Sequence, residues 1–370
     1  MRRIGLIGSG KIVQRAHSVG YRALAGTGAA EVAALADPSE ANRTTAGTLF
    51  NVPAAQQYAD YREMLAKAPI DTVVIATPHS LHAEHAIAAA EAGNAVISEK
   101  PMAVTLEDAD AILAAVKRHA VPYTVVHNFL YTQPVQAALA VLADGSLGAL
   151  IMGRGEMLAL KPDETTRSDL DWRASRAMGG GALIDSSYHE IYTVETLMGS
   201  PVKYVEARLA TLRFPIDVDD TAMMTFEHEN GALSQVTAAW GARAPGHRGR
   251  WVWINGTQGS LRVVYSDAVP VSVSRGRGGK WEQLSTRAAG AEGVSGSGDG
   301  PAGAEAFAQA TLAIDGDDTG HGAFLRAAVA ALEAGAPLPV TPAQARRNLA
   351  IIEGARRASA ERRAMEVSAL

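Results

Sequence analysis

The stretch ISEKPMAV, residues 97–104, places adjacent Glu99 and Lys100 at the end of an apolar run that reads as a buried strand. Pro101 follows directly, and proline disfavours the helical conformation of the residue before it, so we expect Lys100 to be extended at the strand's exit. A structural salt bridge does not need so fixed a backbone. A lysine that contacts a cofactor or a reacting oxygen benefits from it.

A second candidate for chemistry lies in GGGALIDSSYHEIY, residues 179–192, where Asp185 and His189 are four residues apart. The apolar spacing predicts a helix, and residues four apart share one helix face. A nearby carboxylate stabilises an imidazolium, so such a histidine can accept a proton near neutral pH. The same pair is common as a structural hydrogen bond, and the neighbouring features of the chain favour catalysis.

The first third of the chain supplies the elements that must position these groups. Runs rich in valine, isoleucine and alanine alternate with helical stretches, which predicts a parallel sheet covered on both faces. The expected strands are residues 2–8, 31–37, 71–78, 94–100 and 121–129. Because doubly wound folds bind ligands outside the carboxyl ends of their strands, Lys100 is expected in that crevice.

The pattern changes after about Asn128, where longer runs alternate between apolar and polar residues and Asn230-Gly231 is a hairpin signal. We therefore predict an α/β chain with two domains. Residues 1–127 would form a domain with a doubly wound parallel sheet. Residues 128–370 would form a domain with a large open, mostly antiparallel sheet, and its C-terminal helices could pack back on the first domain.

Composition excludes several classes of function. The 370 residues are 20% charged and 47% hydrophobic, with a net charge of −5, which gives no reason to expect nucleic acid or an anionic membrane as a partner. The chain has no cysteine, so thiol catalysis, disulfides and cysteine-ligated zinc are excluded. No stretch has the ~20 apolar residues of a spanning helix. We expect a soluble cytoplasmic protein.

The stretch IGLIGSGKIV, residues 4–13, has the form of a phosphate-binding turn between a strand and a helix. Gly8 permits the turn, Gly10 lets backbone approach a pyrophosphate, and the helix N-terminus supplies N–H donors. Val13 stands where the fingerprint has its third glycine, and a βα turn without ligand gives a similar pattern. The predicted cofactor contacts here are Gly8, Ser9, Gly10, Lys11 and Ile12.

Asp37 ends the second predicted strand, where a carboxylate would accept a hydrogen bond from the adenosine ribose 2′-OH. It would repel a 2′-phosphate, and the next basic residue is Arg43, so NAD is favoured over NADP. Asp37, Pro38 and Ser39 also fit a helix-capping turn, and both interpretations can hold at once.

Three histidines, His79, His82 and His85, follow one another at intervals of three, but they lack the spacing of a zinc-binding helix. We expect no metal site. His82 is instead expected to orient the loop after Thr77-Pro78, beside the cofactor.

These stretches together resemble the Gfo/Idh/MocA family, named after glucose–fructose oxidoreductase and inositol dehydrogenase. The matching motifs run in the family's order over nearly the whole chain: GSGKIV, ATPHSLH, SEKP, DWRASRAMGGGALIDSSYH, DVDDTAMMTF, GTQGSL and AIIEGARRASAERR. The resemblance implies that residues 1–127 are an NAD(P)-binding Rossmann domain and that residues 128–370 are a substrate-binding and oligomerisation α/β domain. Because the sheet of this second domain commonly mediates assembly in the family, a homodimer or homotetramer is expected.

The resemblance also implies roles for single residues. Lys100 would contact both the nicotinamide end of the cofactor and the substrate, and Asp185 with His189 would handle the proton of the reacting hydroxyl. Glu99 would lie near the nicotinamide ribose, and Asn128 would line the cofactor pocket. Side chains suited to stacking on and hydrogen-bonding a polyol are Tyr131, Trp172, Arg173 and Tyr188.

Two departures from the family pattern leave the substrate open: Tyr192 in place of an acidic residue three after His189, and Leu130-Tyr131 in place of an arginine after Asn128. A third departure, Val13, concerns the cofactor fingerprint. The favoured function is an NAD-dependent oxidoreductase that acts on a secondary alcohol or ketone of a sugar, sugar derivative or cyclitol. One alternative is an enzyme of the same family that retains NAD and cleaves glycosides. Another is a non-catalytic dinucleotide-binding sensor.

Overall fold

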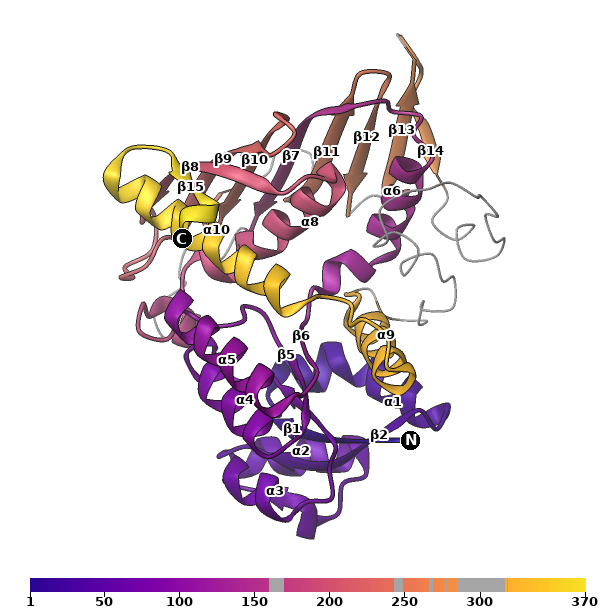
Figure 1. Cartoon of the computed structure of the whole chain (residues 1–370), viewed down its shortest axis with the longest axis vertical. Helices are drawn as coiled ribbons and strands as arrows, with labels where there is room; N and C mark the ends of the chain where they lie inside the picture. Colours follow the sequence, from indigo (N-terminus) through magenta and orange to yellow (C-terminus); the bar gives the residue numbers. More distant parts are fainter. Residues whose placement is uncertain (160–169, 243–248, 266–268, 277, 285–316, 318) are drawn as a thin grey trace. The chain divides into compact units, whose positions relative to one another are not determined.

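The computed structural model (Figure 1) describes residues 1–159, 170–242, 249–265, 269–276, 278–284, 317 and 319–370. The chain divides into two compact units, Met1–Tyr131 with Ile314–Leu349, and Thr132–Ala313 with Ala350–Leu370. The first unit thus combines the N-terminal third of the chain with a segment close to the C-terminus, whereas the sequence-based division places one boundary after residue 127.

The first unit is built on a six-stranded parallel sheet with the order β3-β2-β1-β4-β5-β6. Its strands are β1 (Arg2–Ile7), β2 (Ala30–Ala36), β3 (Gln57–Tyr58), β4 (Thr72–Ile75), β5 (Ala95–Ser98) and β6 (Tyr123–Val125). Every residue of β4 and β5 is buried, as in strands that helices cover on both sides. The strand order reverses between β1 and β4, which is the switch point of a doubly wound fold.

Helices cover both faces of this sheet. In Figure 1 the sheet lies between α4 and α5 on one side and α1 and α9 on the other. The α-helices of this unit are α1 (Ser18–Gly26), α2 (Glu40–Phe50), α3 (Tyr61–Lys67), α4 (His82–Glu91), α5 (Leu106–His119) and α9 (His321–Ala334). Its short helices are η1 (Val13–His17), η2 (Ala54–Gln56), η3 (His79–Leu81) and η4 (Asn128–Tyr131). Helices α1 and α9 pack so closely that a Cβ on Gly20 would lie 2.6 Å from the Gly322 Cα.

The second unit is built on a nine-stranded sheet with the order β14-β13-β12-β11-β7-β10-β9-β8-β15. Its strands are β7 (Leu150–Leu158), β8 (Val202–Ala210), β9 (Thr221–His228), β10 (Leu233–Ala239), β11 (Arg250–Gly256), β12 (Gly259–Val264), β13 (Val271–Arg275), β14 (Glu282–Leu284) and β15 (Met365–Glu366). Neighbours are antiparallel except β7 and β10. The hairpin predicted at Asn230-Gly231 joins β9 to β10, and Gly231 has a φ of +82°.

Burial alternates along the strands of this sheet, most regularly in β9, so one face is core and the other is open. Helices α6 (Gln133–Ala143) and α8 (Tyr188–Met198) contact the sheet. Short helices among the described residues of this unit are η5 (Asp171–Ala174), η6 (Leu183–Ser187) and η9 (Val367–Ala369). Helix α10 (Pro342–Glu361) begins in the first unit and ends in the second. None of the described helices is long and apolar enough to cross a bilayer. The predicted α/β class and both sheet types are confirmed.

Candidate functional site

The turn after β1 has the geometry that the glycine pattern predicts. Gly8 has a φ of +86°, and a Cβ there would lie 2.7 Å from the Ala76 carbonyl oxygen, so a side chain is excluded on both counts. A Cβ on Gly10 would meet only Asn42 Nδ2, at 3.9 Å, so its backbone has open space beside it. Val13, at the third fingerprint position, is fully buried and begins the π-helix η1.

Lys11 and Ile12 are exposed on the first turn after Gly10, while Ser9 is buried beneath it. The Ser9 backbone N–H donates to the Asp37 carboxylate at 2.9 Å, and the Ser39 N–H donates to the other oxygen of Asp37 at 2.9 Å. Asp37 therefore ties the turn after β1 to the loop after β2. Ser39 caps α2 by accepting from the Asn42 N–H at 3.3 Å, so the capping interpretation of this loop is confirmed.

His82 joins the loop after β4 to the loop after β5. Its Nε2 lies 2.9 Å from the Thr77 carbonyl oxygen, and its Nδ1 lies 2.7 Å from the Pro101 carbonyl oxygen. Burial lowers the pKa of His82, and the bonds to these two carbonyls oppose that shift. His82 thus orients the loop that starts at Thr77-Pro78, as expected, and it also holds the loop that contains Lys100.

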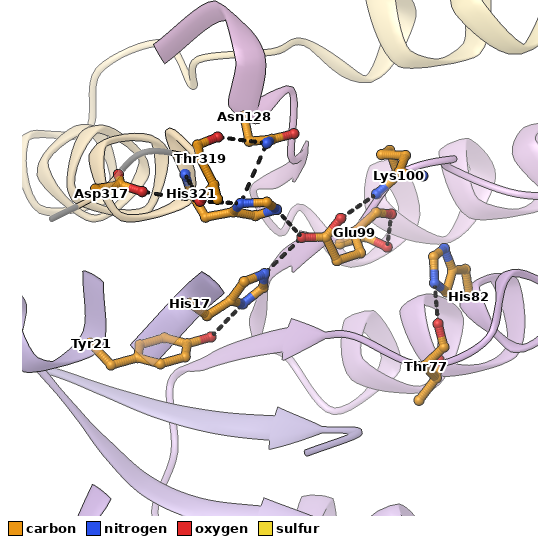
Figure 2. A network of polar contacts seen from close by, with 11 residues as sticks. His17, Tyr21, Thr77, His82, Glu99, Lys100, Asn128, Asp317, Thr319 and His321 are labelled. Carbon is orange, nitrogen blue, oxygen red and sulfur yellow. Dashed lines mark hydrogen bonds and ion pairs between the residues drawn. The ribbon is translucent and has the colours of Figure 1, made fainter. Parts of the chain in front are cut away.

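Lys100 follows β5, and its peptide bond to Pro101 is cis. Its backbone N–H donates to Glu99 Oε2 at 3.2 Å. Glu99 is 7% exposed, and its other oxygen lies 2.7 Å from His17 Nε2 and 3.5 Å from His321 Nε2 (Figure 2). Sequence patterns did not reveal these two histidines, because they come from opposite ends of the chain and belong to no spaced motif.

Asn128 is buried at the start of η4 in the first unit. Its Nδ2 donates to the Thr319 carbonyl oxygen at 2.7 Å and lies 3.4 Å from His321 Nδ1. Asn128 therefore fixes the segment that leads into α9. Tyr131 ends η4, is 8% exposed, and stands edge-on to Phe324 with ring centroids 5.2 Å apart.

The second unit holds Asp185 and His189 on a continuous helical segment whose first turn is the π-helix η6 and whose remainder is α8. The predicted helix is present, with a wider first turn than an α-helix has. The Asp185 carboxylate accepts from Arg173 Nε at 3.1 Å, and His189 Nδ1 lies 2.9 Å from the Tyr192 hydroxyl. Tyr192, which the sequence marks as a departure from the family, is thus a partner of the histidine.

The glycines before this helix explain how Arg173 reaches Asp185. A Cβ on Gly180 would lie within 2.1 Å of the Arg173 carbonyl oxygen, and the Gly181 N–H donates to that oxygen at 3.1 Å. The Arg173 guanidinium also stacks on Trp172, 4.3 Å from the ring centroid. Tyr188 is fully buried, with its ring edge-on to Tyr192 at 5.9 Å.

Among the described residues, one group of at least three histidine or acidic side chains has ligand atoms close together: His17, Glu99 and His321, all within 4.8 Å of one another. The triplet His79, His82 and His85 is not such a group. His85 Nδ1 lies 3.1 Å from the Thr77 hydroxyl, so this histidine of α4 also contacts the loop after β4.

A parallel sheet with a glycine turn at its switch point defines the first unit as a dinucleotide-binding fold. Sequence models of known families agree. Residues 2–127 match the oxidoreductase family with an NAD-binding Rossmann fold, and residues 135–262 match the GFO/IDH/MocA C-terminal domain.

Individual relatives cover much of the chain. It is 32% identical over 294 residues to levoglucosan dehydrogenase from Pseudarthrobacter phenanthrenivorans, covering 71% of this chain and 73% of that protein. It is 29% identical over 263 residues to D-apiose dehydrogenase from Paraburkholderia graminis, covering 70% and 66%. The solved structure of levoglucosan dehydrogenase with NADH aligns over 99% of both chains with a TM-score of 0.83 and 26% identity.

The chain belongs to the Gfo/Idh/MocA family of NAD-binding oxidoreductases. It is a dehydrogenase or reductase, and NAD is its cofactor.

Proposed function

We propose that the protein transfers a hydride between NAD and a secondary alcohol or ketone of a sugar, sugar derivative or cyclitol. The observation that carries the proposal is Lys100 at the carboxyl end of β5, with Glu99 and His82 holding the backbone on either side of it. A cation in that position can polarise the oxygen of a reacting carbonyl or hydroxyl group. Two relatives that match 70% or more of the chain are dehydrogenases named for sugars, which supports the substrate class.

The residues of the first unit fit the dinucleotide. The open space beside Gly10 suits the close approach of a pyrophosphate, and the N–H groups at the start of η1 are donors for it. The Asp37 carboxylate accepts from the Ser9 and Ser39 N–H groups and, at 3.3 Å to each oxygen, from Asn42 Nδ2, so a ribose hydroxyl would take the place of the longer Asn42 bond. Residues proposed to hold NAD are Gly8, Ser9, Gly10, Lys11, Ile12, Asp37, Thr77, Pro78, His82, Glu99, Lys100 and Asn128.

Bound NAD supplies a hydride acceptor, and in the oxidation direction the protein must take the hydroxyl proton. We assign this step to His189. If Nδ1–H of His189 donates to the Tyr192 hydroxyl oxygen, Nε2 carries the lone pair that accepts the proton. Asp185, held by Arg173, adds negative charge near the helix start and stabilises the imidazolium. The alcohol would become a ketone by loss of its hydroxyl proton to His189 and of one hydride to NAD.

Trp172 and Arg173, which are partly exposed, are proposed to bind the polyol together with Tyr131. Tyr188 is fully buried, so we propose that it acts through its packing on Tyr192 and not by contact with the polyol. The stacked Trp172–Arg173 pair offers a flat face and guanidinium donors, which suits a sugar ring with several hydroxyl groups. In this assignment, residues 1–127 are the NAD-binding domain and residues 128–370 are the substrate-binding and oligomerisation domain.

The experiment that tests the function follows NADH absorbance with a panel of levoglucosan, D-apiose, hexoses, uronates, inositols and their keto forms, with NAD and NADP side by side. Turnover of a sugar or cyclitol with NAD supports the proposal. Turnover that needs no added NAD, in protein that retains the cofactor, would point instead to glycoside cleavage. NAD binding in calorimetry without any turnover would point to a sensor.

We also propose a homodimer or homotetramer that forms through the open face of the nine-stranded sheet. Met152, Met223, Leu233 and Trp253 are exposed on its strands, and Met152 is the register partner of Leu233. Light scattering on Met223→Glu and Leu233→Glu tests this, because a charge in a buried interface should shift the mass toward the monomer of 38.6 kDa. Cytoplasmic location stays a prediction.

A further inference from the structure

A buried cluster of Glu99, His17 and His321 lies directly behind Lys100 in the first unit. His17 ends η1, Glu99 follows β5, and His321 begins α9, so three distant segments of the sequence meet at one carboxylate. Figure 2 shows both imidazole rings pointing at Glu99. His17 is fully buried, and His321 is 6% exposed.

The contacts identify Glu99 as the acceptor in this cluster. Burial would raise the pKa of Glu99, but hydrogen bonds from His17 and His321 hold it well below its usual range, so the carboxyl group is ionised. Burial lowers the pKa of His17, which is therefore the neutral donor of a proton from Nε2. The Tyr21 hydroxyl, 3.4 Å from His17 Nδ1, completes the bonding of that ring.

The same three side chains could be taken for the ligands of a metal, but their spacing favours a shared proton. Two ligands that bind a tetrahedral zinc at about 2.0–2.1 Å lie about 3.4 Å apart. His17 Nε2 and Glu99 Oε1 are 2.7 Å apart, which is the length of a charge-assisted hydrogen bond.

The cluster reaches Lys100 through the second oxygen of Glu99. Oε1 faces the two histidines, and Oε2 accepts the backbone N–H of Lys100. On the far side of Lys100, the Pro101 carbonyl oxygen is held by His82. The backbone around Lys100 is thus held by hydrogen bonds on both sides. The bond on the N-terminal side, between the Lys100 N–H and Glu99 Oε2, depends on the orientation of the Glu99 carboxylate.

We propose that His17 and His321 are positioning residues: they orient the Glu99 carboxylate so that it holds the Lys100 backbone, and thereby the Lys100 ammonium, in its working position. The inference rests on the proposed function in one respect, since it takes Lys100 as the catalytic lysine. Neither histidine needs to contact the cofactor or the substrate for this role.

The first experiment observes the Lys100 amide itself. Glu99-Lys100 is the only Glu-Lys pair in the chain, so a protein with ¹³C-carbonyl glutamate and ¹⁵N-lysine gives one amide signal in a carbonyl-selected spectrum. In His17→Phe this signal should shift and exchange with solvent at least about tenfold faster, as expected when a hydrogen bond to a charged group is weakened. His17→Gln, which keeps a donor, should restore most of the wild-type signal.

Two further variants complete this test. His321→Phe should give a smaller change of the same kind, because its contact with Glu99 is 3.5 Å long, and it decides the question if His17→Phe does not fold. His228→Gln is the matched control: this histidine is fully buried and doubly bonded in the second unit, to the Ser200 carbonyl and the Ser234 hydroxyl. An unchanged Lys100 amide in both phenylalanine variants would overturn the proposal.

The second experiment measures steady-state kinetics with a substrate found in the panel. His17→Phe should lower kcat by about 10- to 100-fold, as displacement of a catalytic group does, while KM stays near wild type and His17→Gln recovers most of the rate. If the Lys100 amide signal changes but kcat does not, His17 and His321 position Lys100 as proposed, and the catalytic role of Lys100 is wrong. If the amide signal is unchanged and kcat falls, the proposal that these histidines position Lys100 is wrong.

Discussion

The two units place their candidate catalytic groups by different means. In the first unit, Lys100 lies in a loop whose backbone is hydrogen-bonded to buried polar side chains: Glu99 accepts the Lys100 N–H, and His82 bonds the Pro101 carbonyl. In the second unit, His189 lies on helix α8. The next residue, Glu190, anchors that helix to β11, because its carboxylate accepts from Arg250 Nε at 2.6 Å. A loop can be shifted without unfolding its unit, whereas a helix anchor cannot be removed without loss of stability.

This difference predicts that substitutions around Lys100 alter turnover more than stability, and that substitutions of the α8 anchor do the reverse. Four experiments test the contrast.

The largest effect is expected for Lys100→Met. We expect kcat to fall about 10³-fold or more with little change in NAD affinity, because a contact of the transition state is lost while the dinucleotide turn is intact. Steady-state kinetics and NADH fluorescence titration measure the two quantities. Lys117→Met, at an exposed position of α5, is the control. Near-normal turnover in Lys100→Met would end the proposed mechanism.

Arg250→Met should be the strongest test of the second unit. It leaves the Glu190 carboxylate, 1% exposed, without the guanidinium that neutralises it, and we expect a loss of about 3–5 kcal/mol in the free energy of unfolding. Urea denaturation measures the loss, with exposed Lys203→Met as the control. NADH affinity of the folded variant should be unchanged, and a parallel loss of affinity would contradict the assignment of NAD binding to the first unit.

Gly8→Ala and Gly10→Ala should distinguish a glycine that the fold requires, Gly8, from one that cofactor binding requires, Gly10. At Gly8 the positive φ and the Ala76 carbonyl should cost about 1–3 kcal/mol of stability. At Gly10 the added methyl group has room, so stability should change by less than about 0.5 kcal/mol while NADH affinity falls. Thermal unfolding and fluorescence titration of both variants are the measurements. Equal NADH affinity for Gly10→Ala and wild type would remove Gly10 from the cofactor site.

The pH dependence of stability is the last test, because its effect is spread over several pH units. Burial lowers the pKa of His85 from 6.5 to about 4 and that of His127 to about 3, so the folded unit resists protons that the unfolded chain accepts. Stability is then complete above about pH 6.5 and is lost as the pH falls toward 4, by up to about 1.4 kcal/mol per pH unit for each histidine.

Urea denaturation at several pH values between 7.5 and 4.5 measures this slope. His85→Gln should flatten it, and exposed His119→Gln should not. Stability that does not change over this interval would show that these histidines titrate alike in the folded and unfolded chains.

Sequence patterns were sufficient for much of the first unit, because its signals are local. The strand runs, the turn at Gly8 and the capping serine at 39 each depend on neighbouring residues, and each is present in the structure. The Asn-Gly hairpin between β9 and β10 is predictable for the same reason.

The relation between Asp185 and His189 shows where local reasoning ends. Their spacing predicts a helix, and the segment is helical, but the π turn of η6 and the partners Arg173 and Tyr192 follow from packing against residues elsewhere. Arg173 reaches Asp185 because Gly180 and Gly181 let two backbone segments approach closely. Which donor reaches a carboxylate is a property of the assembled unit.

By itself the sequence determined the α/β class, the order of the elements and the residues that could do chemistry, since these follow from periodicity, turn residues and side-chain type. Only the tertiary structure decided that His17 and His321 meet Glu99, and that α9 belongs to the first unit although about 190 residues separate it from η4. Hydrogen bonds between distant segments leave no period or spacing in the sequence, because the fold, not the chain order, sets their distance.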